Sequence, residues 1–206
     1  MLKRAAHWYS CVFLMHEVQE AAARDGSDAI CGVNLTREVR VDDRGNVTGI
    51  CDAEVISATE LAEMIFGKHM LLRKAVKRAR SVGVVVRDFI GGPCKTTEVL
   101  AIHTEPTVAD SSAVAGIDGL RFGGPPTEVL ESAMARRAED VDGAPPTVLL
   151  CLGHARWGRA QLMNECLRGD WGVNATRATQ ELISTPIVHA ELMSEQTGTK
   201  YVAPPQ

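Results

Sequence analysis

Short apolar runs, separated by glycine, proline and charged residues, mark the expected strands of the chain. Aliphatic and β-branched runs of this length favour buried strands. They occur at residues 11–15, 29–35, 84–90, 99–103, 120–122 and 148–152. The run at residues 148–152 is uninterrupted, which is typical of a strand that is buried on both faces. Gly32, inside the second run, predicts a point where another part of the backbone comes close.

Apolar residues at helical spacing predict the helices. Ser57 and Glu60 have the spacing of a capping box, in which the two side chains satisfy free N–H groups of the first turn. The helical pattern that follows continues to Gly83, which we expect to end the helix. Residues 127–139 and 159–168 predict two further helices.

The order of these elements predicts an α+β fold. Strands and helices alternate only in part, and Gly91-Gly92-Pro93 and Gly123-Gly124-Pro125 each follow a strand. We expect hairpin pairing at both turns, and hence a mixed or mostly antiparallel sheet rather than a doubly wound parallel one. No linker divides the chain, so residues 1–193 predict a single domain. The polar segment 194–206 predicts a disordered tail.

Charge limits the classes of partner. The chain of 206 residues has a formal net charge of −4, which argues against a protein that depends on nucleic acid. Residues 73–80 nevertheless gather five basic side chains without an acid: Arg73, Lys74, Lys77, Arg78 and Arg80. This cluster predicts a solvated helix face, and the alternative is a patch for RNA, DNA or an acidic partner.

The cysteines and the chain start bear on the compartment. None of the six cysteines has C-x-x-C or zinc-site spacing, so we expect reduced thiols, no structural metal and no cofactor. No apolar run is long enough to span a membrane. The first sixteen residues contain Lys3 and Arg4 and no acid. We therefore expect an intracellular protein, cytoplasmic or mitochondrial.

The segment 152–162 is the most informative part of the chain for a ligand site. We expect a tight turn between a buried strand and a helix, with glycines at 153 and 158 in the G-x-x-x-x-G spacing of a phosphate loop. Arg159 and Ala160 stand where that loop needs lysine and a hydroxyl residue, which excludes an ATPase of this type.

Two interpretations of this turn stay open. In the structural one, the glycines only permit the path of the backbone and Trp157 packs under the helix. In the functional one, the free N–H groups of the first helical turn form the floor of a small anion-binding pocket, with His154 and Arg156 at its rim.

The same segment carries a family resemblance. Residues 152–162 read L-G-H-A-R-W-G-R-A-Q-L and are followed by Glu165 and Trp171. This order resembles the AlgH (YqgE) family, whose pattern is L-G-Y-A-G-W-G-x-G-Q-L-E-x-E-L, then N-x-W. Further matches in the same order lie at residues 12–17, 32–35, 91–93 and 99–103, so the resemblance covers most of residues 10–188.

The resemblance implies a compact α+β fold with a curled, barrel-like sheet, and it implies no established activity. The chain departs from the family pattern at His154, Arg156 and Ala160, where the family has tyrosine, glycine and glycine. The family's name points to transcriptional regulation, but no helix-turn-helix is evident in this chain.

We therefore expect a non-catalytic binding or regulatory protein with a small anion or metabolite pocket. Its expected lining is Gly91, Gly92, His103, Gly153, His154, Arg156, Trp157, Gly158 and Gln161. One alternative is a hydrolase or thiol-dependent enzyme that uses Cys94 or His154 with His103. Another is nucleic-acid binding through residues 73–80. The oligomeric state does not follow from the sequence.

Overall fold

The computed structural model describes residues 13–19, 29–35, 38–41, 47–50, 69–114, 118–168 and 170–171. The strands in these parts are β1 (Phe13–Gln19), β2 (Ala29–Asn34), β3 (Glu38–Val41), β4 (Val47–Ile50), β5 (Val85–Ile90), β6 (Cys94–His103), β7 (Ser111–Ala113), β8 (Arg121–Gly123) and β9 (Thr147–Gly158). The helices are α2 (Met70–Ser81), α3 (Pro126–Glu139) and α4 (Arg159–Leu167).

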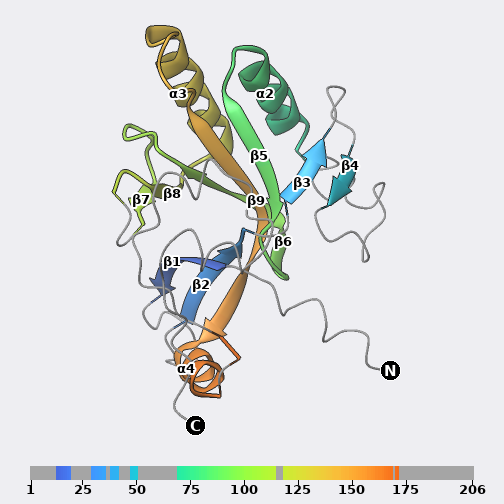
Figure 1. The fold of residues 1–206 in the computed structure, drawn as a ribbon, viewed down its shortest axis with the longest axis vertical. Coiled ribbons are helices and arrows are strands. Elements are labelled where there is room, and N and C mark those ends of the chain that lie inside the picture. The colour runs from blue at the N-terminus through green and yellow to red at the C-terminus, as the bar shows by residue number, and fades with distance from the viewer. Residues whose placement is uncertain are drawn as a thin grey trace.

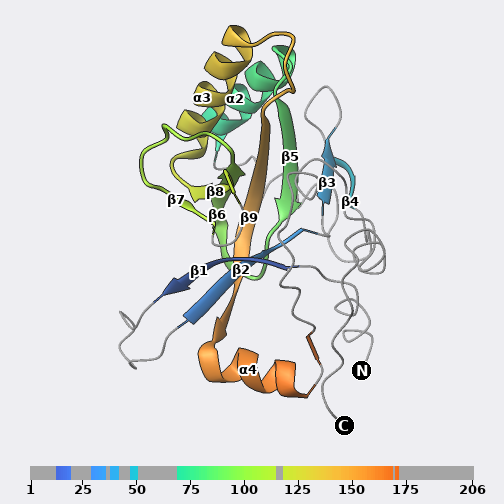
Figure 2. The same ribbon diagram turned by 60° about the vertical axis from the view of Figure 1, so that its left-hand side comes forward.

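These elements form one α+β domain, as the sequence predicts. A curled, mostly antiparallel sheet makes a half-barrel through the middle of the molecule (Figure 1). Helices α2 and α3 lie side by side at one end of the sheet, and α4 lies at the other end, beside β1 and β2 (Figure 2). The molecule therefore has a two-helix end and a one-helix end, joined by β9.

Strand β9 is the centre of the sheet. Over residues 147–152 it pairs in parallel with β5 and antiparallel with β6, and over residues 155–158 it pairs antiparallel with β2. Gly153 has a φ of 68°, a conformation that favours glycine, at the point where the strand leaves β5 and goes on to β2. One strand thus belongs to both halves of the sheet.

The tight turn expected over residues 153–158 is wrong. The chain stays extended to Gly158, because Ala155 and Trp157 alternate inward and the backbone of this stretch bonds to β2. A single glycine with positive φ bends the strand without ending it. The helix that begins at Arg159 is confirmed.

The two predicted hairpins are also wrong. Strand β9 lies between β5 and β6, so the strands on either side of Gly91-Gly92-Pro93 do not pair with each other. The second Gly-Gly-Pro turn leads from β8 directly into α3, with Pro126 in its first turn. The α+β class stands because every strand pair except β5–β9 is antiparallel.

Most of the other predicted elements are found with shifted ends. The first strand runs on to Gln19 and the strand before His103 starts at Cys94, while β3, β4 and β7 were not predicted. Gly83, with a φ of 88°, follows the end of α2 as expected. The proposed capping box at Ser57 and Glu60 and the tail at 194–206 lie outside the described residues.

Gly32 marks a close approach, as predicted. A Cβ atom added there would lie 2.7 Å from Sδ of Met15 and 3.5 Å from the ring of Trp157. The absence of a side chain lets β1 and the end of β9 close over β2.

The core lies on both faces of β9. Val148 and Leu150 pack in the layer covered by α2 and α3, whereas Leu149 and Cys151 face the opposite layer, with Phe89. Successive side chains of a strand point to opposite faces, so a strand buried on both sides must be apolar at every position. This is the physical reason for the uninterrupted apolar run at residues 148–152.

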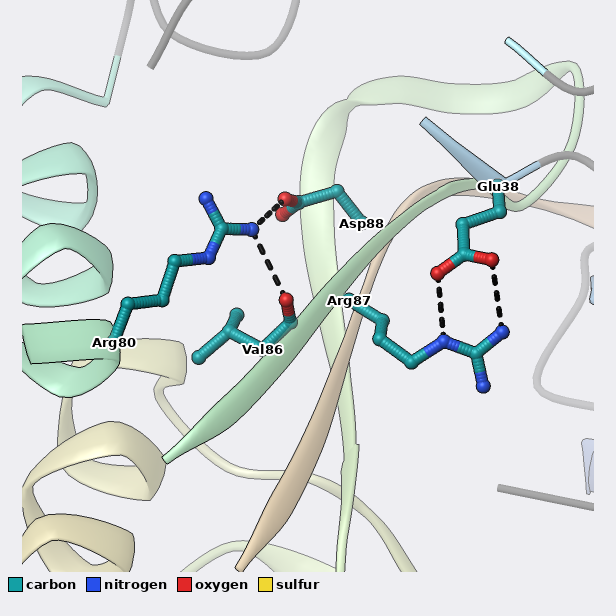
Figure 3. Close-up of polar contacts among 5 residues, drawn as sticks. All are labelled: Glu38, Arg80, Val86, Arg87 and Asp88. Atoms are coloured by element: carbon teal, nitrogen blue, oxygen red, sulfur yellow. Dashed lines mark hydrogen bonds and ion pairs between the residues drawn. The ribbon is translucent and has the colours of Figure 1, made fainter. Parts of the chain in front are cut away.

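Two ion pairs tie β5 to its neighbours (Figure 3). Arg80 of α2 donates to Asp88, 2.6 Å away, and to the backbone oxygen of Val86. Arg87 makes a bidentate ion pair with Glu38 of β3, and its guanidinium lies 5.1 Å from the centre of the Phe89 ring. Asp88 is buried and Arg80 is its cationic partner, so this pair fixes α2 against the sheet.

A second polar cluster fastens α3 to the end of β6. The carboxylate of Glu105, buried at 1% exposure, pairs with Arg136 at 2.7 Å and accepts a hydrogen bond from Ser132. His103 is fully buried beside it. Its Nε2 lies 3.2 Å from the Gly123 oxygen, and its Nδ1 accepts from the Glu105 N–H, which indicates the neutral Nε2–H form.

Removing Arg80 is expected to destabilise the fold strongly. Burial raises the pKa of Asp88 and Arg80 opposes that rise, so Arg80→Ala leaves a buried carboxyl without its cation. We expect a loss of about 3–5 kcal/mol in the free energy of unfolding, measured by urea denaturation. The double change Arg80→Met with Asp88→Leu removes both charges and should recover much of this loss. If Arg80→Ala and the unmodified chain unfold at the same urea midpoint, the Arg80–Asp88 pair does not stabilise the fold.

Acidification is expected to destabilise the fold through His103. Burial lowers the pKa of His103 below its ordinary value of 6.5, so the folded state favours the neutral ring. Its contribution to stability is complete above pH 6.5 and is lost as the pH falls below that value, with a slope of at most about 1.4 kcal/mol per pH unit. Thermal unfolding across this range should therefore show a shallower pH dependence for His103→Asn than for the unmodified chain. Parallel curves for the two proteins would contradict this assignment.

Candidate functional site

Several of the predicted site residues meet along the second half of β9. A Cβ atom added to Gly91 would clash with the backbone oxygen of Gly153, and one added to Gly92 would clash with the backbone of His154 and Ala155. The two glycines therefore pass directly over β9, backbone against backbone. Their lack of side chains serves this close crossing.

His154 and Arg156 lie on the same stretch of β9 but differ in exposure. His154 is buried at 8% exposure and stands opposite Cys94 of β6, whereas Arg156 is exposed and stands opposite Cys31 of β2. Gly158 is the residue before the first turn of α4. The structure therefore brings one cation, one imidazole and a helix start into the same region.

Trp157 and Gln161 belong to a network that holds α4 to the sheet. The ring of Trp157 packs edge-on against Phe13 at 5.1 Å and Trp171 at 6.0 Å between ring centres. Trp171 donates its indole N–H to Glu165 at 2.7 Å, and Gln161 donates to the other oxygen of Glu165 at 2.8 Å. These contacts account structurally for the tryptophans, the glutamine and the glutamate of the motif.

His103 does not join these residues. It pairs in register with Val148, while Cys94 pairs with His154 six positions further along β9, a separation of roughly 20 Å at the usual strand rise. The predicted pairing of Cys94 with His103 as a nucleophile and base is therefore wrong. His154, across the strand pair, is the histidine that stands opposite Cys94.

The basic cluster of α2 divides into two parts. Arg73, Lys74, Lys77 and Arg78 are exposed on the helix, whereas Arg80 turns toward the sheet and pairs with Asp88. Residues Leu72, Val76 and Ala79 form the buried stripe of the same helix. The exposed basic face is thus the side of the helix that the sheet does not cover.

An open groove of about 620 Å³ lies between the C-terminal parts of α2 and α3. The α2 side contributes Arg78 and Val82, and the α3 side contributes Glu131, Met134, Ala135, Arg137, Ala138 and Val141. Ala135 and Ala138 are small and exposed, which leaves space between the helices. The groove lies at the two-helix end, opposite α4.

Sequence reasoning did not find this groove or the ion pairs of Arg80 with Asp88 and of Arg87 with Glu38. A groove between two helices depends on their relative position, which no local pattern specifies. Arg87 and Asp88 did carry a signal, since two charges inside an otherwise apolar strand require buried partners. Their partners Glu38 and Arg80 could not be assigned from spacing.

Within the described parts of the chain, no three histidine, cysteine or acidic residues lie close enough to hold a metal ion. None of the helices that the structure describes is long and apolar enough to cross a membrane.

The chain is similar to solved structures. The AlgH protein of Pseudomonas aeruginosa, solved in solution, is 15% identical with a TM-score of 0.48, and the alignment covers 97% of this chain and 94% of that one. A Corynebacterium diphtheriae protein, solved by crystallography, is 19% identical with a TM-score of 0.47, covering 94% and 80%. No curated protein matches the chain.

A family model described as AlgH-like matches residues 55–199. The match begins later than residue 10 and ends beyond residue 188, the limits of the resemblance read from the motifs, and it includes the tryptophan–glutamine segment. It covers well over half of the chain, and it assigns no reaction. The chain therefore belongs to the AlgH-like family.

Proposed function

We propose that this chain is a non-catalytic binding protein that receives an anionic partner on the exposed face of α2. The observation that carries the proposal is the set of four exposed cations, Arg73, Lys74, Lys77 and Arg78, on a helix with no acidic residue. They are gathered on a chain whose formal net charge is −4. A local concentration of one sign on an oppositely charged protein favours and steers an anionic partner.

The buried polar groups support a binding role over an enzymatic one. Asp88, His103 and Glu105 are the acid–base groups that burial would favour for chemistry. Each is engaged in holding elements together: Asp88 with Arg80, His103 with Gly123, and Glu105 with Arg136.

The small-anion site expected near residues 153–161 stays a prediction. Its groups in the structure are exposed Arg156, buried His154 and the start of α4 after Gly158. This region lies at the one-helix end, while α2 lies at the other (Figure 1). The two anion-binding hypotheses can therefore be separated by changing one end at a time.

Charge reversal on α2 is expected to weaken anion binding. We expect the chain with Lys74→Glu and Lys77→Glu to bind a fluorescent oligoglutamate peptide about tenfold more weakly than the unmodified chain, by anisotropy at low salt. Both side chains are exposed, so folding should be preserved.

Arg156→Glu is the matched control at the other end of the molecule, and it should bind like the unmodified chain. If Arg156→Glu weakens binding and the α2 change does not, the anion site is the one expected near residues 153–161, and the proposal for α2 is wrong.

A thiol-dependent enzyme is the second candidate function. The observation in its favour is the cross-strand pairing of Cys94 with His154. Cβ atoms of directly opposed residues lie about 4.5–5.5 Å apart, close enough for an imidazole to activate a thiol. Cys94 is only partly buried, so a reagent can reach it.

Alkylation by iodoacetamide across pH, read by peptide mass spectrometry, tests this candidate. A catalytic Cys94 should be labelled much faster than Cys166 at neutral pH, and His154→Ala should abolish this difference. Cys166, a partly exposed thiol of α4, is the internal reference. Burial raises the pKa of the Cys151 thiol, which should stay unlabelled. Matching profiles for Cys94 and Cys166 would exclude the enzyme.

A further inference from the structure

Two stripes of opposite charge border the α2–α3 groove. On α2, Lys74, Arg78 and Val82 recur at intervals of four residues and so form one stripe, of which Arg78 and Val82 line the groove. On α3, Glu128, Glu131, Ala135 and Ala138 form the corresponding stripe, and the last three line the groove. The α2 stripe is therefore basic and the α3 stripe acidic, while Arg137, which also lines the groove from α3, lies outside that stripe.

The charges of the two stripes are available to a partner. Lys74, Arg78, Glu128 and Glu131 are all exposed, and among the described residues no ion pair joins the two stripes. Arg137, which also lines the groove, donates to the backbone oxygens of Asp140 and Gly143 and is held in place by them.

The end of the groove is apolar. Val82 is 48% exposed and Val141 is 65% exposed, and both line it together with Met134. Exposed aliphatic side chains that border a concave surface are typical of a site that receives apolar groups.

From these features, we infer that the groove receives an amphipathic segment of a partner protein, with acidic side chains on the edge that meets α2 and apolar side chains against Val82, Met134 and Val141. This inference rests on the proposed anion-binding role of α2 and specifies its partner. The opposite edge of the segment, which meets Glu128 and Glu131, is neutral or basic.

The charge pattern favours a peptide over other anions. A nucleic acid presents phosphates on every side, so the acidic stripe of α3 would repel the strand that the basic stripe of α2 attracts. A small phosphate would leave the apolar end of the groove unused. A peptide can carry different charges on its two edges, and only this class of partner matches both stripes.

The size of the groove fits a short segment. From Lys74 to Val82 the α2 stripe extends roughly 12 Å, about two turns of helix. A segment of this length, bound along the groove as an amphipathic helix or an extended strand, buries little area. The complex should therefore be weak and reversible.

A panel of synthetic peptides tests the inference on the full chain. All members share one apolar face and differ only in the charges of the two edges: acidic and basic, acidic on both, basic on both, and a scrambled sequence. The peptide with one acidic and one basic edge should bind most tightly by fluorescence anisotropy. Ala135→Trp, which fills the groove from an exposed position, should weaken that binding about tenfold.

Ala160→Trp is the matched control, because Ala160 is an exposed helical alanine on α4, remote from the groove. It should bind like the unmodified chain. If Ala135→Trp leaves peptide binding unchanged while Lys74→Glu with Lys77→Glu still weakens oligoglutamate binding, the groove inference falls and the proposed function stands. If neither Ala135→Trp nor Lys74→Glu with Lys77→Glu weakens binding, the groove inference and the proposed function are both wrong.

Two further outcomes would overturn the inference. Single-stranded DNA that binds more tightly than every peptide would assign the basic face to nucleic acid. A dimer in light scattering that Ala135→Trp converts to a monomer would assign the groove to a second copy of the chain.

Discussion

The whole fold depends on the burial of β9 from both sides. Every residue from Val148 to Ala155 is buried, and the stretch from Val148 to Leu152 is apolar throughout, because an unpaired polar group there would be costly in stability. Because β9 bonds to β5, β6 and β2, its burial brings together parts of the chain that lie far apart in sequence. The close crossing of Gly91 and Gly92 over the same strand is a consequence, since nothing larger than glycine fits there.

Around this strand, charged residues hold the outer layers in place. Arg80 fixes α2 through Asp88, Glu38 fixes β3 through Arg87, and Arg136 fixes α3 through Glu105. Each tie includes at least one side chain that is largely removed from water, where breaking the pair costs far more than at the surface. The same groups would have been the obvious candidates for acid–base chemistry. In the function proposed above, the exposed charges of α2 and α3 are the features that face the partner.

The sequence predicted local elements better than their assembly. The apolar run at residues 148–152 and the helical patterns before Gly83 and after Thr127 correctly predict a strand and two helices, because burial and periodicity are local properties. The hairpins at the two Gly-Gly-Pro turns failed because a turn residue shows that the chain bends and does not show which strand it meets next. The turn predicted at Gly153 is wrong for the same reason: a glycine with positive φ can bend a strand as well as end it. The predicted family is confirmed, and the tryptophans and the glutamine of its motif attach α4 to the sheet. The inter-helix groove depends on distances that no motif records.

The parallel pairing of β5 with β9 also sets the relative height of the two helices. Helix α2 leads into β5 and α3 leads into β9, so each helix end is carried by the strand that follows it. A slip of one residue between these strands would slide one helix past the other by about 3.3 Å and exchange the faces of every side chain on the slipped strand. The strict alternation of Val148, Leu149, Leu150 and Cys151 between two layers forbids that slip. The shape of a surface open to solvent is thereby specified by aliphatic side chains that never touch it.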